Sequence, residues 1–540
     1  MTEKRLVDTM EKQKNTKLKM KDMDWMAVAF FGLASVTILA LALFCMLCPD
    51  NLMHSDITAE VVLSKLLSEE GSLISKEWFY STEIRIIYSH LIMIPLFHMF
   101  ADYSLVKLLS IFIFYILLVY AYCMLAKRFD MDKKWVFLCL ALLFAPLSNE
   151  YLDMMFIGCF YTAQIICTYL ILSFTIKEKK TKKGFWICGS ILCVAALILG
   201  TSGLRYLASL YLPMVLSYLF LFLVEPDGQK KERGIPVLFS VVMTGFAGVG
   251  FLVNKFYLAV HYSFDTTSEV AFVPISEVPE RFLTSIRLML EFMGYRESTV
   301  MTPLGLVNPV KCLFLIVFIG MVLWLWKNRM EILSATERFF LYFFVFLFLI
   351  NWYMLIFTNV LMQYRYWLPV YVIGVLLVGI FLQKWEPVVR VQKMFMALFF
   401  AVVVLASLYG ELWQDVKYND CAKRYAYMEF LEANDYDFGY ATFWNASVTE
   451  YLSDGQIKVA NLDVENGEVV PYEWLLPKAY YRAGFHEGRT FVLLARTEEA
   501  GMLNGDFTVM EDGVCVYQDE YYAIYEGQQG MYIFSEGYEP

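Results

Sequence analysis

The sequence lacks most of the patterns that identify soluble enzymes. Its 11 cysteines show no paired ligand spacing, and most lie in hydrophobic runs, where cysteine serves as a small apolar side chain. Residues 411–540 contain no glycine-rich phosphate loop, no Cys/His metal set and no convincing Ser/His/Asp order. The long hydrophobic segments before residue 411 carry very few charged residues. These absences argue against a zinc module, a nucleotide-binding loop and a triad hydrolase.

Apolar residues dominate what is present. They make up 59% of the 540 residues, aromatic residues make up 17%, and the mean hydropathy is +0.52. A soluble protein has roughly 45–50% apolar residues. The composition therefore predicts a polytopic α-helical membrane protein. Its length leaves room for about ten helices of roughly 20 residues and one soluble domain.

The order of basic and apolar stretches predicts the topology. Residues 1–24 are polar and basic, and no small-residue cleavage site follows the first span at 25–48, so we expect a cytoplasmic tail. Ten further spans are predicted at about 104–126, 135–148, 156–176, 185–202, 207–224, 235–260, 310–326, 339–358, 367–382 and 394–410. Lysine-rich connections alternate with connections that have few basic residues, which places the first loop and the C-terminal end outside the plasma membrane.

Residues 411–540 differ from the rest of the chain in composition. Acidic residues outnumber Lys and Arg there roughly three to one, and the whole chain has a net charge of −10. A helical pattern over about 412–433 precedes short β-rich pieces at 438–443, 456–459, 491–495, 514–518 and 521–525. We therefore expect a small extracytoplasmic α/β domain. Its cysteines, Cys421 and Cys515, leave open whether a disulfide forms.

The first external loop, residues 49–103, carries two carboxylates at the predicted membrane edge. Asp56 and Glu60 are four residues apart on a predicted helix over 57–67, so both lie on one face of it. Acidic residues ahead of a long external loop of a membrane protein are candidates for chemistry. The alternative is that Asp56 only caps the helix by accepting a backbone N–H.

Other external positions add charge near the membrane surface. The second external loop contains Glu150 and Asp153, which are candidate ligands for a divalent cation if they meet Asp56. Alternatively, they are solvated loop charges. Arg205 and Arg365 each stand beside a tyrosine at an external helix end, where an arginine can bind phosphate oxygens bidentately. The alternative is that both are ordinary interface anchors.

Three further external features lie near the candidate site: a set of polar residues and two segments. Glu83 and Arg85 follow in the first loop, and Tyr366 follows the second arginine. The apolar piece 86–100 is broken by a proline, which favours a re-entrant or interfacial segment. The amphipathic stretch 261–309 is either a lid over the site or a helix that lies on the bilayer.

Taken together, residues 20–410 resemble the GT-C superfamily of polyprenyl-phosphate-sugar-dependent glycosyltransferases. The resemblance rests on the acid after the first span, the proline-containing piece that follows it, the acids of the second external loop, and the Arg-Tyr-x-x-Pro that enters a late span. Within the superfamily the pattern is similar to the protein O-mannosyltransferase and aminoarabinose-transferase type. The mannosyltransferases show an adjacent Asp-Glu pair, whereas this chain has Ser55-Asp56 with Glu60 one turn later.

The resemblance implies an inverting transfer of a sugar from a polyprenyl phosphate to an acceptor hydroxyl at the outer face of the membrane. Asp56 would be the general base, and Arg365 with Arg205 would stabilise the departing phosphate. Glu60, Glu83 and Glu150 would orient the acceptor or hold a metal. The resemblance leaves open whether a divalent cation such as Mg²⁺ or Mn²⁺ is needed. The expected partners are the lipid-linked sugar, a glycan, lipid or protein acceptor, and the membrane, with no nucleic acid.

Two other classes of protein share some of these features. A lipid-linked glycan transporter or polymerase of the bacterial cell envelope would also be polytopic, but we would expect its ionisable residues near the middle of the spans. A membrane anchor that presents the acidic domain does not explain the number of spans after the first.

Overall fold

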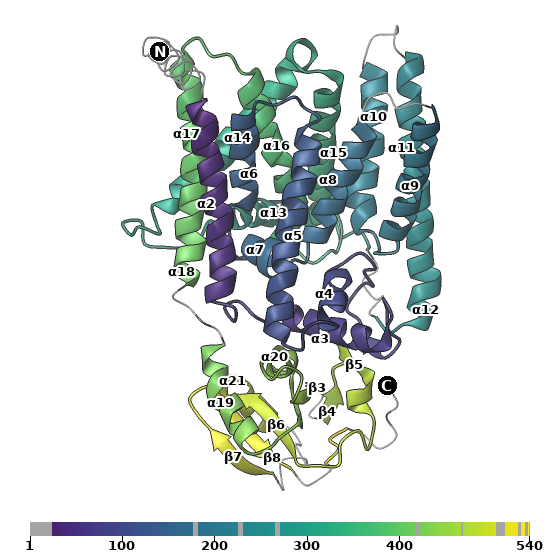
Figure 1. The fold of residues 1–540 in the computed structure, drawn as a ribbon, viewed down its shortest axis with the longest axis vertical. Helices are drawn as coiled ribbons and strands as arrows, with labels where there is room; N and C mark the ends of the chain where they lie inside the picture. The colour runs from purple at the N-terminus through teal and green to yellow at the C-terminus, as the bar shows by residue number, and fades with distance from the viewer. Residues whose placement is uncertain are drawn as a thin grey trace, which may run out of the picture.

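The structure is a computed structural model that describes residues 24–176, 182–224, 230–264, 270–416, 419, 421–465, 468–503, 513–527, 531–534, 538 and 540. The predicted basic tail at 1–24 lies outside these residues except for Asp24. A bundle of long helices forms one part of the molecule, and a small α/β domain lies at one end of it (Figure 1). The first helix of the bundle begins at the opposite end from this domain (Figure 1).

Eight described helices are long and apolar enough to cross a membrane. They lie at Trp25–Leu47 (α2), Tyr103–Ala126 (α5), Leu207–Val224 (η2 with α10), Gly234–His261 (α11, η4 and α12), Val307–Ile332 (α14), Ala335–Phe357 (α15), Tyr364–Lys384 (η5 with α16) and Val391–Asp415 (α17, η6 and α18). A ninth span is obtained if α6 (Lys133–Phe144) and α7 with η1 (Asn149–Ile157), which meet at 104°, count as one broken span.

The predicted number of about eleven spans is therefore higher than the number of helices of sufficient length. The predicted span at 135–148 is the short helix α6, and the chain bends sharply after it. The predicted spans at 156–176 and 185–202 are α8 (Thr162–Ile176) and α9 (Lys182–Gly200), whose apolar parts are too short to pass as full spans. Hydrophobicity located these helices correctly, but it does not show where a helix bends or ends.

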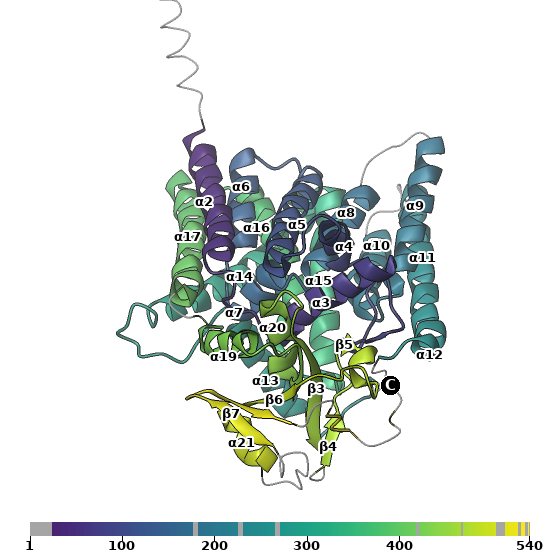
Figure 2. The ribbon, with the colours of Figure 1, turned by 60° about the horizontal axis from the view of Figure 1, so that its bottom comes forward.

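The first loop folds as a cap across the end of the bundle. Helix α3 runs over Ser55–Glu70, longer than the predicted 57–67, and ends at Gly71, whose φ of +64° is a backbone conformation that glycine adopts at little cost. A two-residue strand β1 (Trp78–Phe79) and the short helix α4 (His90–Phe97) follow. Helix α3 lies between the bundle and the C-terminal domain, beside α20 (Figure 2).

The C-terminal domain is built on a six-stranded mixed sheet with the strand order β4-β3-β2-β6-β8-β7. The strands are β2 (Phe438–Thr442), β3 (Lys458–Glu465), β4 (Glu468–Pro471), β6 (Thr490–Ala495), β7 (Val514–Gln518) and β8 (Tyr522–Glu526). Strand β2 is parallel to both β3 and β6, and the outer pairs are antiparallel. Its helices are α19 (Ala422–Ala433), α20 (Phe443–Leu452) and α21 (Arg496–Leu503). The β-rich pieces predicted from the sequence overlap five of these strands, although the piece at 456–459 reaches only the first two residues of β3.

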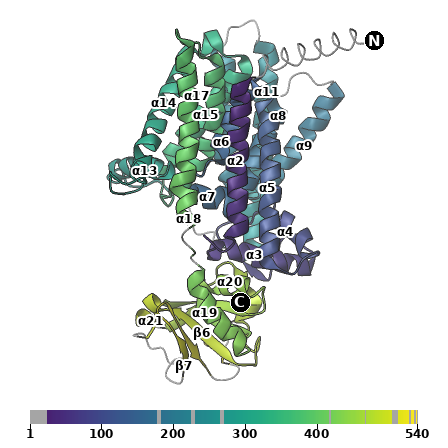
Figure 3. The same cartoon turned by 60° about the vertical axis from the view of Figure 1, so that its left-hand side comes forward.

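The domain is fixed on the first loop by contacts between segments that are distant in the sequence. The Ser447 hydroxyl of α20 donates to the backbone oxygen of Ser55 at 3.1 Å and lies 3.0 Å from the Thr58 hydroxyl. Strand β1 pairs antiparallel with β5 (Leu476–Pro477). Figure 3 shows the domain beneath α3 and α4, with the chain entering it after α18 (Trp413–Asp415). Thus Asp56 and the C-terminal domain lie at the same end of the bundle.

The two cysteines of the C-terminal domain do not form a disulfide. Cys421 is fully buried where the domain meets the first loop, and its thiol is 3.7 Å from the backbone oxygen of Met53. Cys515 is exposed on β7. The domain is therefore stabilised by its apolar core and its contacts with α3, not by a cross-link between these two positions.

Candidate active site

Asp56 lies in the first turn of α3, and it does not cap that helix. The N-cap residue is His54, and no side chain accepts a hydrogen bond at the cap position. The prediction that Asp56 serves only as a cap is therefore wrong, because the helix begins one residue before it. No hydrogen bond to the Asp56 carboxylate is found among the described residues, and its nearest ionic partner is His54 Nδ1 at 3.9 Å. A negative charge in the first turn is favourable to the helix dipole.

His54 connects Asp56 to the second external loop. Its Nε2 is 3.1 Å from Asp153 Oδ2, and its ring stacks on Phe160 with 6.4 Å between the centroids. Burial alone would lower the pKa of His54, but the hydrogen bond to Asp153 and the neighbouring carboxylates raise it. His54 was not among the residues predicted for the site. The only local signal was its position two residues before Asp56.

Burial raises the pKa of Asp56, and the charge of Asp153 raises it further, while His54 and Arg365 act in the opposite direction. The side chain of Asp56 remains 39% exposed. A carboxylate whose pKa lies above its usual range and that has no fixed hydrogen bond is a better proton acceptor than an ordinary surface aspartate.

The second external loop folds into the short helix α7 (Asn149–Leu152) and the π-helical turn η1 (Asp153–Ile157). The Ser148 hydroxyl caps α7 by accepting the backbone N–H of Tyr151 at 3.2 Å. Burial and the charge of Asp153 raise the pKa of Glu150, which the Tyr364 hydroxyl lowers. Asp153 Oδ2 lies 3.1 Å from the histidine, and Asp153 Oδ1 is buried without a hydrogen-bond partner among the described residues. Within the described ranges no group of three or more His, Cys, Asp and Glu side chains is arranged to hold a metal ion. The assignment of Glu150 and Asp153 to a metal stays a prediction.

Arg365 stands in the 3₁₀ turn η5 (Tyr364–Trp367) at the start of α16 (Leu368–Lys384). Its positive charge acts on both Asp56 and Glu150. In the part of the chain that the structure describes, the guanidinium has no hydrogen bond and no ion pair. Its five N–H donors are therefore free for an anionic ligand, and the free N–H groups at the start of a helix favour the same charge.

A second charged cluster surrounds Glu83. Its Oε1 is 2.8 Å from Arg85 and 2.7 Å from Arg205. Arg85 lies over the ring of Tyr88 at 4.6 Å, and Arg205 lies over another tyrosine ring. Burial alone would raise the pKa of Glu83, but the two guanidinium groups lower it below its usual value. Glu83 is therefore ionised and serves to hold two arginines, which is unsuited to proton transfer.

A turn of the backbone at Gly203 brings Arg205 to this cluster. The Gly203 φ of +78° lies in the left-handed region, and the chain turns there before the π-helical turn η2 (Leu207–Tyr211). A Cβ at this position would stand 3.4 Å from Glu83 Oε2. The Arg205 side chain is thereby brought beside a carboxylate more than 100 residues earlier in the chain, a juxtaposition that the sequence does not reveal.

Glu60 lines a small cavity together with Glu83 and Arg85 of the second cluster. Its Oε2 is buried without a hydrogen-bond partner among the described residues. Burial raises the pKa of Glu60 to about 7, although Arg85 and Lys107 act to lower it. Asp56 instead faces the C-terminal domain across a separate cavity. The two carboxylates therefore share a helix face, as expected, without sharing one cavity.

The raised pKa of Glu60 predicts a stability change that depends on pH. Between the ordinary pKa of 4.5 and about 7, the unfolded chain has lost the Glu60 proton while the folded chain still holds it, so the unfolding free energy falls as the pH rises through this range. Below pH 4.5 both states are protonated and this loss of stability is absent. Glu60→Gln should therefore raise the unfolding free energy by about 1–3 kcal/mol at pH 8 and have little effect near pH 4.5. Thermal unfolding of the purified protein at both pH values measures this difference.

The matched control is Glu69→Gln, which makes the same change on the same helix at a side chain that is 61% exposed. It should show no such pH dependence. An equal gain for Glu60→Gln at both pH values would contradict the assignment of the titration to Glu60.

An amphipathic cavity of about 700 Å³ adjoins the second cluster. Apolar side chains of the bundle helices form much of its wall, and Glu83, Arg205 and Tyr366 contribute polar groups. Two buried amide atoms in this wall, Gln164 Oε1 and Asn351 Nδ2, have no hydrogen-bond partner in the described residues. Buried polar atoms are normally paired in proteins, so this wall is suited to a ligand with its own polar groups.

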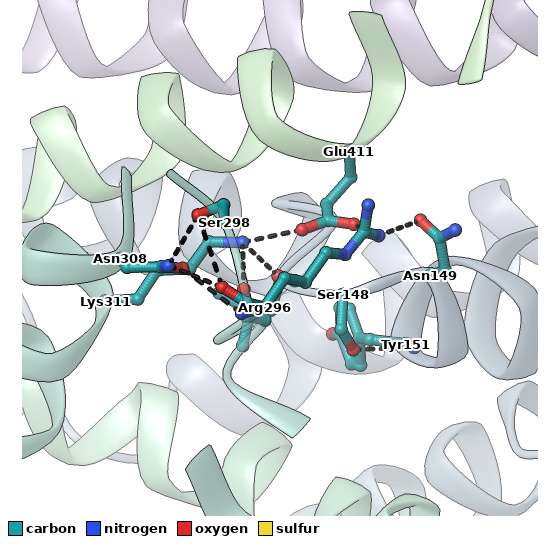
Figure 4. A network of polar contacts seen from close by, with 10 residues as sticks. Ser148, Asn149, Tyr151, Arg296, Ser298, Asn308, Lys311 and Glu411 are labelled. Atoms are coloured by element: carbon teal, nitrogen blue, oxygen red, sulfur yellow. Dashed lines mark hydrogen bonds and ion pairs between the residues drawn. The ribbon is translucent and has the colours of Figure 1, made fainter. Parts of the chain in front are cut away.

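A buried ionic network contacts the second external loop through Leu147 and Asn149 (Figure 4). Lys311 Nζ is 2.6 Å from Glu411 Oε1 and donates to the backbone oxygen of Leu147 at 2.7 Å. Arg296 pairs with Glu411 and also donates to the Asn149 side chain. Because Lys311 and Glu411 are almost fully buried, loss of one partner would leave an uncompensated charge. The network therefore contacts the chain on both sides of Ser148, where the helix that bears Glu150 begins.

The described helices and the site define a multi-pass membrane protein with a charged centre at one end of its bundle. Two solved structures of ArnT from Cupriavidus metallidurans are similar to it. The one bound to undecaprenyl phosphate aligns with a TM-score of 0.53 at 11% identity, and the apo structure with 0.54 at 12%. Each alignment covers 92% of this chain and 97% of the other chain.

No protein-family model and no curated relative matches the sequence. At 11–12% identity, the similarity to ArnT is one of fold. It confirms the fold class predicted from the sequence, and it extends the similarity beyond residues 20–410, where the sequence resemblance ended.

Proposed function

We propose that this protein is a glycosyltransferase that moves a sugar from a polyprenyl phosphate to an acceptor hydroxyl, with inversion at the anomeric carbon. The observation that carries the proposal is that Arg365, which has no hydrogen bond or ion pair among the described residues, acts electrostatically on Asp56, while its chain neighbour Tyr366 lines the amphipathic cavity. A free guanidinium whose charge reaches a carboxylate of raised pKa matches a reaction that releases a phosphate and removes a proton.

The amphipathic cavity fits the donor lipid. A polyprenyl chain needs apolar walls, and its phosphate needs cationic partners, which Arg205 in the wall and Arg365, next to the wall residue Tyr366, would supply. The similar ArnT structure was obtained with undecaprenyl phosphate bound. This supports undecaprenyl phosphate as the lipid to test first. Tyr366, which lines the cavity next to Arg365, would contact the phosphate or the sugar.

In the proposed reaction the acceptor oxygen attacks the anomeric carbon while the bond from that carbon to the phosphate oxygen breaks. The acceptor proton passes to Asp56, and the electron pair of the broken bond stays on the phosphate. Arg365 stabilises the charge that develops there. His54 and Asp153 keep Asp56 in place on one side, and Glu83 holds Arg85 and Arg205 on the other.

The same proposal places the protein in the plasma membrane with residues 411–540 outside. The C-terminal domain and Asp56 share one end of the bundle, and the lysine-rich connections predict that the other end is cytoplasmic. A divalent cation at Glu150 and Asp153 remains a proposal that the same assay can address by chelation.

Thermal stabilisation by the lipid tests the donor assignment directly. The purified full chain should be stabilised by undecaprenyl phosphate more than by undecaprenol, because only the former offers a charge to the arginines. Undecaprenyl-phosphate-linked sugars are then supplied, and the release of undecaprenyl phosphate is measured with the anomeric configuration of the product. Equal stabilisation by both lipids, with no release from any donor, would contradict the proposed function.

A further inference from the structure

A second large cavity lies between α3 and the C-terminal domain, and apart from Asp56 its lining residues have no role in the proposed reaction. Its volume is about 740 Å³. Asp56 forms part of one wall, and the opposite wall comes from the ends of β2 and β3, the start of α20 and the segment after β4. In α/β sheets, ligands bind outside the carboxyl ends of parallel strands, which is where β2 and β3 present this wall.

Aromatic side chains cover much of the cavity wall. Phe443, Trp444, Tyr472 and Trp474 line it, and Trp444 is 57% exposed. Their rings are neighbours: the centroids of Phe443 and Trp444 are 5.1 Å apart, and those of Phe443 and Tyr472 are 5.8 Å apart. An exposed tryptophan beside other aromatic rings offers a flat apolar face to a ligand.

The charged side chains of this cavity are all acidic. Asp56, Asp463 and Glu498 line it, and no Lys or Arg is among the lining residues that the structure describes. Glu498 is occupied, because it accepts hydrogen bonds from the Thr442 hydroxyl and the backbone N–H of Ala495. Asp463 uses one oxygen for a backbone N–H and keeps the other available. The cavity therefore offers hydrogen-bond acceptors and repels anions.

Tyr472 lines the same cavity as the two available carboxylates. Burial raises the pKa of its hydroxyl, and the charges of Asp463 and Asp56 raise it further. The aromatic surface and the proposed catalytic base thus belong to one cavity, although Asp56 and Tyr472 are separated by most of the chain. A ligand that packs on the aromatic surface would have its polar groups close to Asp56.

We infer that this cavity is the acceptor site, and that the acceptor it takes is an uncharged saccharide. The inference rests on the proposed function, since it assigns Asp56 to the acceptor hydroxyl. The apolar C–H face of a sugar ring packs on aromatic faces, and its hydroxyls donate to carboxylates such as Asp463. An acceptor that presents a phosphate or a carboxylate would meet three acidic side chains in a wall whose described residues include no Lys or Arg.

Binding of saccharides to the purified full chain tests the inference without any donor. The probes are immobilised uncharged oligosaccharides, the same oligosaccharides carrying phosphate, and unmodified peptides. We expect retention on uncharged oligosaccharides only. Trp444→Ala should weaken it roughly tenfold or more, and Trp444→Phe should recover most of the loss, because a phenyl ring restores an apolar face. Asp463→Asn should weaken binding less than Trp444→Ala.

The matched control is Tyr521→Ala, which removes another exposed aromatic side chain of the same domain outside the cavity and should leave binding unchanged. Preferred binding of phosphorylated glycans or of peptides would overturn the inference. It would equally be overturned if no uncharged oligosaccharide bound, or if Trp444→Ala bound as well as the parent.

Donor binding and acceptor binding can fail separately. Stabilisation by undecaprenyl phosphate without retention on uncharged oligosaccharides would leave the proposed function in place and remove the acceptor assignment. If the chain is retained on uncharged oligosaccharides in a way that depends on Trp444, but is not stabilised by undecaprenyl phosphate, the saccharide site would stand and the proposed donor would be wrong.

Discussion

Asp56→Asn should lower sugar transfer by roughly 10²–10⁴-fold while the protein still folds and binds the donor lipid. An amide has nearly the shape of the carboxylate but cannot accept the proton of the acceptor hydroxyl. Asp56 makes no hydrogen bond among the described residues, so the substitution breaks no structural contact of that kind. The loss of a charge in the first helical turn costs about 0.3–1 kcal/mol of stability, and relief from burying that charge offsets part of it.

The measurement is the initial rate of transfer from an undecaprenyl-phosphate-linked sugar, with thermal unfolding of the same preparations. Glu69→Gln on the same helix serves as the control, since it also neutralises one acid, at an exposed position paired with Lys65. It should retain the parent rate. Activity of Asp56→Asn within a few-fold of the parent would refute the assignment of Asp56 as the base.

The pH dependence of the transfer rate tests the assignment of Asp56 as the base independently. Because burial raises the pKa of Asp56, the parent rate should fall with decreasing pH through a value above the ordinary aspartate range. Below that value the base is protonated and cannot accept a proton. Asp56→Asn should lose this dependence along with the activity.

Arg365→Ala should reduce transfer by roughly 30- to 900-fold, which corresponds to about 2–4 kcal/mol of lost transition-state stabilisation. The guanidinium has no ionic or hydrogen-bond partner among the described residues, so its removal should change stability little. Arg365→Lys should recover only part of the rate, since an ammonium group cannot reproduce the bidentate fork of arginine. Transfer rates at saturating acceptor, together with stabilisation by undecaprenyl phosphate, measure both effects.

Arg287→Ala is the matched control for the loss of a guanidinium. Arg287 lies on α13 (Val278–Phe292), its side chain is 69% exposed, and its ion pair with Glu291 is a surface pair of low energy. This variant should be active. An equal loss of folded protein in Arg365→Ala and Arg365→Lys, with unchanged activity per folded molecule, would indicate that Arg365 is only an interface anchor.

The stretch around Arg287 also shows where sequence periodicity is ambiguous. The segment 261–309 was predicted to be amphipathic, and α13 confirms a helix there with its buried residues on one side. The same pattern fits a lid and a helix that rests on the bilayer. Neither alternative is decided by the helix itself, since both require one apolar face and one polar face.

The amino-acid sequence by itself determined the class of the protein, the places of its helices and the strands of its last domain. Hydrophobic runs of about 20 residues and alternating strand patterns are local properties, so they can be read without knowing any contact. For the same reason the sequence placed Asp56, Glu83, Arg205 and Arg365 at helix ends and loops. It did not show the bend after α6, because that bend depends on how the neighbouring helices pack.

Only the tertiary structure decided which of these side chains act together. His54 meets Asp153 across 99 residues of chain, Glu83 meets Arg205, and Asp56 faces Tyr472 of the C-terminal domain. Each pairing depends on how distant segments pack, and no local pattern encodes that packing. The sequence supplied the charged groups at one end of the bundle, but their pairing, their burial and therefore their pKa values arise only when the folded chain excludes water around them.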